Sequence, residues 1–81
     1  MAKHPSSIQQ WRDATEKDRR EIPAHCFLDQ ADRTFPYKLW DGEKYVISER
    51  MLRAAISRAN SLERMDISRK ASRILKREFG D

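Results

Sequence analysis

Cysteine and glycine are scarce in this sequence of 81 residues, which contains one cysteine and two glycines. The single cysteine, Cys26, cannot form an internal disulfide, and His25 beside it offers only one further ligand, whereas a zinc site usually needs four. The two glycines stand far apart, at positions 42 and 80, so no glycine-rich loop can cradle a nucleotide phosphate. Paired catalytic carboxylates on an apolar background are missing as well. We therefore expect a non-enzymatic protein with no catalytic residues, no metal and no cofactor.

Long hydrophobic runs are also missing. Without a stretch of about eighteen apolar residues or a signal-like segment, the sequence predicts an intracellular protein with no membrane contact. Its length corresponds to one small domain of modest stability, too small for a large active-site cleft. With 38% hydrophobic and 37% charged residues the chain has little apolar surface to spare. We therefore expect another protein, or a second copy of this chain, to supply part of the burial.

The last third of the chain has the clearest pattern, with apolar residues recurring every three or four positions. Ser48 predicts the start of a helix over about 48–60, because its hydroxyl can accept a hydrogen bond from a free first-turn N–H. Asp66 is the expected cap of a second helix over about 66–79, although Ser61 could start an earlier turn, and Gly80 is expected to end this helix. We expect the two helices to pack together through their apolar stripes. These stripes are Met51, Leu52, Ala55, Ile56 and Ala59 in the first helix and Ile67, Ala71, Ile74, Leu75 and Phe79 in the second.

Positive charge gathers on this helix pair. The formal net charge is +4, and residues 49–81 hold nine Lys and Arg against five Asp and Glu, whereas residues 1–48 hold eight of each kind. The cations that fall within an arc of about 120° on the second helix, opposite its apolar stripe, are Arg69, Lys70, Arg73, Lys76 and Arg77. Such a face can neutralise the phosphates of nucleic acid, bind an acidic protein, or simply remain solvated.

The N-terminal segment predicts a helix over about 6–20, since serines precede a tract of good helix formers. Its apolar content is nearly confined to Ile8 and Trp11, which lie one turn apart. Such a helix either lies solvated with Trp11 pinned to the domain, or acts as an arm that binds another chain through both residues. We therefore divide the chain into a helical arm at 1–21 and a small helical domain at 22–81.

Pro23 ends the N-terminal helix and opens an irregular segment rich in aromatic residues. Within it, the pair Asp41-Gly42 favours a tight turn, because both residues tolerate positive φ. We expect a short hairpin in which Tyr37–Trp40 pairs with Lys44–Ile47. The predicted fold class is therefore mainly α, with an N-terminal helix, one β-hairpin and a C-terminal pair of packed amphipathic helices. The aromatic residues that either join the core or stack on bases are Trp11, Phe35, Tyr37, Trp40 and Tyr45.

Several stretches of the chain resemble a small module of tailed-phage proteins that is often appended to prohead-protease-like or other structural chains. The resemblance covers about residues 22–79. The stretches that carry it are Arg33-Thr34-Phe35-Pro36-Tyr37-Lys38, Asp41-Gly42 with Lys44, the run from Met51 to Ala59, and Lys70-Ala71 with Leu75. The resemblance implies a head-associated phage protein with a binding or assembly role, located in the host cytoplasm or in the virion.

Three functions agree with these observations. The first is a phage accessory or structural protein that acts as a protein-binding or assembly module, as the resemblance implies. The second is a nucleic-acid-binding accessory that uses the basic face of the last helix. The third is a phage inhibitor of a host protein machine. The expected partner is accordingly a phage or host protein, a second copy of the chain, or nucleic acid.

Overall fold

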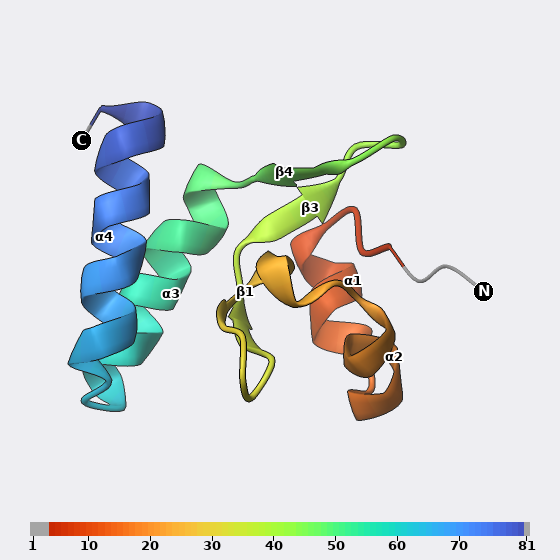
Figure 1. The fold of residues 1–81 in the computed structure, drawn as a ribbon, viewed down its shortest axis with the longest axis horizontal. Helices are drawn as coiled ribbons and strands as arrows, with labels where there is room; N and C mark the ends of the chain where they lie inside the picture. The colour runs from red at the N-terminus through yellow and green to blue at the C-terminus, as the bar shows by residue number, and fades with distance from the viewer. Residues whose placement is uncertain (1–3, 81) are drawn as a thin grey trace.

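The computed structural model describes residues 4–80 of the chain. Within this range the chain forms four α-helices, one 3₁₀ turn and four short strands (Figure 1). In chain order these are α1 (Ile8–Asp13), α2 (Glu16–Glu21), η1 (Ala24–Cys26), β1 (Phe27–Asp29), β2 (Thr34–Pro36), β3 (Lys38–Trp40), β4 (Tyr45–Ile47), α3 (Glu49–Ser61) and α4 (Met65–Phe79). The predicted helical character is confirmed, but the fold is mixed because the strands form two antiparallel pairs. Residues 1–3 of the predicted arm and Asp81 lie outside the described residues.

The prediction of one N-terminal helix over 6–20 is wrong, since two short helices take its place. Ser7 caps α1 by accepting a hydrogen bond from a first-turn N–H at 3.2 Å. The helix stops at Ala14, whose ψ of 130° is extended. Thr15 then starts α2, because its side chain and that of Asp18 bond reciprocally to each other's backbone N–H groups. These side-chain bonds compete with helical continuation and break the helix in two.

β3 and β4 form the predicted hairpin. Leu39 lies opposite Val46 and Trp40 opposite Tyr45, in an antiparallel register. The turn between the strands is held by Asp41, whose carboxylate accepts from two backbone N–H groups at 2.8 and 2.9 Å. This hairpin was predictable because a turn pair separates two short runs with strand-forming residues. Of the expected pair, however, only Gly42 has a positive φ, of 108°, and Asp41 holds the turn through its side chain instead.

The sequence does not predict the second antiparallel pair, formed by β1 and β2. Asp29 closes the connection between the strands, where its carboxylate accepts from the Asp32 N–H at 3.1 Å. Arg33 and Phe35 have φ values of 53° and 60°, in a region that residues other than glycine rarely adopt. Each of these strands has only three residues, and left-handed residues lie beside or within them. Such short strands show no alternation of apolar and polar residues, so the sequence predicted an irregular segment.

α3 and α4 pack side by side and run antiparallel (Figure 1). Ser48 caps α3 as predicted, and Gly80 ends α4 in the left-handed conformation with a φ of 74°. The prediction that Asp66 caps α4 is wrong. Arg64 occupies the cap position, but its side chain accepts no capping hydrogen bond from a backbone N–H of the helix, and Asp66 lies in the first turn. The Asp66 carboxylate accepts two hydrogen bonds from the Arg64 guanidinium.

β1 lies between two groups of buried side chains. Because side chains alternate along a strand, Phe27 and Leu28 join different groups. Met51 and Leu52 of α3 are divided in the same way, so α3 also belongs to both. The N-terminal core consists of Trp11, Ile22, Cys26, Phe27 and Met51, with Ile8, Leu39 and Tyr45 packed against it. The helix-pair core consists of Leu28, Phe35, Tyr37, Leu52, Ala55, Ala59, Ile67, Ala71, Ile74 and Leu75, with Ile47 and Ile56 packed against it.

The predicted apolar stripes of the two helices are buried or half-buried with one exception. Phe79, expected on the stripe of α4, is 40% exposed. It lies one turn beyond Leu75, the last buried residue of that helix. Ala55, Ala59 and Ala71 are all buried, and their small side chains allow the two helices to approach closely.

Candidate nucleic-acid interface

The exposed side of α4 carries most of the predicted basic face. Arg69, Arg73, Lys76 and Arg77 are exposed, while the opposite side of the helix is buried. Between Ile67 and Arg77 the helix contains no Asp or Glu, so no acidic residue of α4 interrupts the row of cations. At 1.5 Å per residue, Arg69 and Arg73 are about 6 Å apart along the axis, and Arg73 and Lys76 about 4.5 Å. The helix thus presents positive charge along more than two turns.

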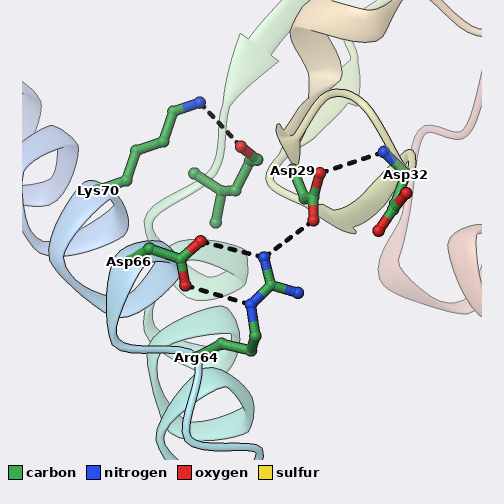
Figure 2. Close-up of polar contacts among 6 residues, drawn as sticks. Asp29, Asp32, Arg64, Asp66 and Lys70 are labelled. Atoms are coloured by element: carbon green, nitrogen blue, oxygen red, sulfur yellow. Dashed lines mark hydrogen bonds and ion pairs between the residues drawn. The ribbon is translucent and has the colours of Figure 1, made fainter.

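Lys70 does not belong to this exposed row, which corrects the predicted set of five. Its Nζ donates to the carbonyl oxygen of Leu28 in β1 at 2.8 Å, and the residue is half-buried (Figure 2). On the helical wheel Lys70 lies at the edge of the basic arc nearest the apolar stripe. Lys70 therefore makes a structural contact between α4 and β1.

Arg64, at the start of α4, also has partners within the chain. Its guanidinium donates to Asp29 at 3.0 Å and to Asp66 at 3.1 and 3.2 Å (Figure 2). The pKa of Asp66 is lowered, chiefly by this hydrogen bond from Arg64. The pKa of Asp29 is lowered first by the Asp32 N–H and then by Arg64. This cluster joins α4 to the β1–β2 connection and neutralises the acidic residue in the first turn of α4.

At the other end of α4, Arg77 pairs with the neighbouring Glu78, with Nε and Oε2 3.0 Å apart. Both side chains are solvent-exposed, so this pair contributes little to stability and can open. Among residues 4–80, no partner is found for the side chains of Arg69, Arg73 or Lys76. We call these three residues, together with Arg77, the α4 basic face. They are the cations of α4 best placed to meet an external anion.

Ile8 and Trp11, the predicted partner contacts, lie at the N-terminal core. Trp11 is only 2% exposed and packs edge-on against Phe27, with ring centroids 5.4 Å apart. Its indole Nε1 donates to the Lys38 carbonyl at 2.8 Å, so the polar end of the ring is satisfied inside the protein. Ile8 is half-buried beside it. A partner could reach Trp11 only if α1 came away from the core, and the division into arm and domain stays a prediction.

His25 and Cys26 do not form a reactive pair. Cys26 is fully buried, and burial raises the pKa of its thiol to about 11, which keeps the sulfur protonated at neutral pH. Its Sγ lies 3.9 Å from His25 Nδ1, and that ring nitrogen is also 3.1 Å from Lys38 Nζ. Within residues 4–80, no three His, Cys, Asp or Glu side chains come close enough to hold a metal ion.

The structure also shows two exposed apolar residues that the sequence interpretation missed. Leu62 is 56% and Met65 is 44% exposed, and they flank the turn between α3 and α4. The signal was present in the sequence as two apolar residues just outside the predicted stripes. Isolated exposed apolar side chains are normal on protein surfaces, so the sequence pattern alone did not distinguish them.

Comparison of the chain with models of protein families, with curated proteins and with solved structures gave no match. The resemblance to a phage module therefore stays an expectation from the sequence. The helices within residues 4–80 include none with the length and apolar character that crossing a bilayer requires.

Proposed function

We propose that this protein is a non-enzymatic binding module that contacts the phosphate backbone of nucleic acid through the α4 basic face. One observation carries the proposal: Arg69, Arg73 and Lys76 are exposed in a row on a helix that has no acidic residue between positions 67 and 77. Neighbouring cations that have structural partners, Lys70 and Arg64, turn toward β1 instead. The row is thus not consumed by contacts within the described part of the chain.

The physical basis of such binding is counterion release. Each Lys or Arg that neutralises a phosphate frees a condensed cation, and the affinity then falls steeply with salt. Phosphate contacts carry no sequence information, because every nucleotide presents the same group. The α4 basic face contains three arginines, whose planar guanidinium groups can bind phosphate oxygens in a bidentate manner. We therefore expect binding that is electrostatic and insensitive to base sequence.

The test is fluorescence anisotropy with labelled duplexes of about 20 bp and two unrelated sequences. With three to four phosphates neutralised, raising salt from about 50 to about 200 mM should weaken binding on the order of 100-fold. The variant Arg69→Gln/Arg73→Gln should weaken binding to both sequences equally and make the salt dependence shallower.

A matched control variant is Arg12→Gln/Lys17→Gln, which removes the same charge from exposed positions of α1 and α2. Figure 1 shows these helices on the far side of the molecule from α4. The proposal predicts that the control retains most of the affinity. Equal loss in the two variants would instead indicate a response to net charge alone, and no binding at tens of micromolar at low salt would exclude the phosphate contact.

A second candidate function is a protein-binding or assembly module, as the resemblance to tailed-phage proteins implies. Leu62 and Met65 favour it, because exposed apolar residues flanking a helix turn can be buried by another chain. If a second copy is the partner, light scattering should show a molar mass that rises with protein concentration. The variant Leu62→Ser/Met65→Ser should then remain monomeric. A monomer at all concentrations, together with no retained phage or host protein in a pull-down, would contradict this candidate.

A further inference from the structure

Trp40 and Tyr45 form an aromatic pair at the end of the β3–β4 hairpin. They lie directly opposite each other in the antiparallel register, so their side chains project from the same face of the ribbon. Their rings meet edge to face, with centroids 5.1 Å apart and planes at 66°. The tip of the hairpin extends away from α4 (Figure 1), so this pair is separate from the α4 basic face. Of the five aromatic residues considered for base stacking, Trp11, Phe35 and Tyr37 are buried, whereas Trp40 and Tyr45 are half-buried.

His4 covers this pair. Its imidazole lies nearly parallel to the Trp40 indole, with centroids 4.0 Å apart and planes at 17°. Its Nδ1 is hydrogen-bonded to the Tyr45 hydroxyl at 2.9 Å. The His4 residue itself is exposed, so its ring is the outer layer of the stack. A planar nitrogen heterocycle thus already occupies the outward face of Trp40 and uses one ring nitrogen to bond to Tyr45.

We infer that Trp40 and Tyr45 form a stacking site for an unpaired nucleobase, and that His4 is an internal occupant of this site. Every nucleobase has a π-face for Trp40 and ring nitrogen or carbonyl groups that can bond to a hydroxyl. A purine is larger than an imidazole and would cover more of the indole. Burial raises the pKa of Tyr45 to about 12, so the phenol keeps its proton at neutral pH and can donate to the incoming ring.

Opening the site requires little rearrangement of the chain. Trp40 N–H donates to the Pro5 carbonyl at 2.9 Å, and Pro5 is buried. The backbone next to His4 is therefore anchored, and the imidazole can leave Trp40 by rotation about its own side-chain torsions. Because His4 competes with any external ring, it lowers the apparent affinity of the site. Removing the imidazole should raise that affinity.

This inference rests on the proposed nucleic-acid function but assigns a different element and a different nucleic-acid form. A base can stack on Trp40 only when it is unpaired, so His4→Ala should bind a labelled oligo-dA single strand at least about five-fold more tightly than the parent. Binding to a duplex of the same length should not change. Addition of oligo-dA should also quench tryptophan fluorescence in the His4→Ala variant. Trp40→Leu in that background should abolish the quenching, because the remaining Trp11 is buried.

Two further variants make the test decisive. Trp40→Phe is the alternative if circular dichroism shows that Trp40→Leu fails to fold. It keeps an aromatic ring at this position and should retain the preference for single strands. Arg69→Gln/Arg73→Gln should lower duplex binding without removing the gain that His4→Ala brings. If His4→Ala changes neither single-strand affinity nor fluorescence quenching, or changes duplex and single-strand binding equally, the stacking site is refuted while the α4 basic face can still stand. Stacking without any duplex binding would refute the α4 proposal alone.

Discussion

Arg64 and Asp29 are 35 positions apart in the sequence, yet the Arg64 guanidinium lies 3.0 Å from the Asp29 carboxylate (Figure 2). The bond joins the start of α4 to the end of β1. The same guanidinium lies over the Phe35 ring of β2, 5.8 Å from its centroid. The contacts of the Arg64 guanidinium and the hydrogen bond from Lys70 to Leu28 together hold one side of α4 against the β1–β2 pair. The opposite side of α4, which carries the basic face, is left to the solvent.

The first prediction concerns the pH dependence of stability. The folded-state pKa of Asp29 is lowered by the Asp32 N–H and by Arg64, so its contribution is present above the ordinary pKa of aspartate. That contribution is lost as the pH falls through the folded-state value. Asp29→Asn should therefore lower the free energy of unfolding by about 1 kcal/mol at neutral pH, and the difference from the parent should shrink as the pH is lowered below the folded-state pKa of Asp29. Urea unfolding at several pH values measures this difference. Asp32→Asn is the control, because it leaves the backbone N–H in place.

The second prediction separates the two lysines of α4. Lys70→Met removes the donor to the buried Leu28 carbonyl and should lower the free energy of unfolding by about 1 kcal/mol. It should leave nucleic-acid affinity nearly unchanged. Lys76→Met removes the same charge from an exposed position. It should lower nucleic-acid affinity and leave the free energy of unfolding nearly unchanged. Urea melts and anisotropy titrations on both variants check this, and equal effects of the two changes on affinity would contradict the assignment of Lys70 as a structural contact.

The third prediction tests the helix-pair core. Leu75 is 6% exposed, and Leu75→Asp would place an unpaired charge among apolar side chains. The cost should be several kcal/mol, comparable with the whole stability of a domain this small. Leu62→Asp introduces the same group at a position that is 56% exposed and should change the melting temperature little. Thermal melts followed by circular dichroism provide the comparison. A Leu75→Asp variant that melts like the parent would rule out this packing.

The fourth prediction addresses the N-terminal segment. Trp11 fills the N-terminal core and bonds to the Lys38 carbonyl, so Trp11→Ala should lower the free energy of unfolding by about 3–5 kcal/mol. Trp11→Phe keeps an aromatic ring but removes the indole N–H donor, and it should lower the free energy of unfolding less. Deletion of residues 1–20 should then expose Phe27 and Met51 and weaken the cooperativity of urea unfolding. If residues 21–81 instead unfold with the parent's midpoint, the segment acts as an arm and does not belong to the core.

The sequence by itself determined the elements whose cause is local. Ser48 and Gly80 mark the ends of the helix pair because capping involves only adjacent backbone groups. The β3–β4 hairpin follows from Asp41-Gly42 in the same way. The break at Ala14 also has a local cause, because Thr15 and Asp18 form a capping box that starts a new helix. The spacing of these two residues indicates a capping box in the sequence, but the good helix formers around them favoured one continuous helix.

Only the tertiary structure decided which chemically similar residues are structural and which remain accessible. Lys70 and Lys76 both fall within the basic arc predicted from the sequence, but the Leu28 carbonyl of β1 accepts a hydrogen bond from Lys70, whereas Lys76 is exposed. The sequence left open whether Trp11 packs against the domain or binds another chain, because Phe27 and Met51, which bury it, are distant in the sequence. The stack of His4 on Trp40 likewise depends on a contact between segments far apart in the chain. Periodicity and capping report interactions within a few residues, whereas burial and partner choice arise from the packing of distant segments.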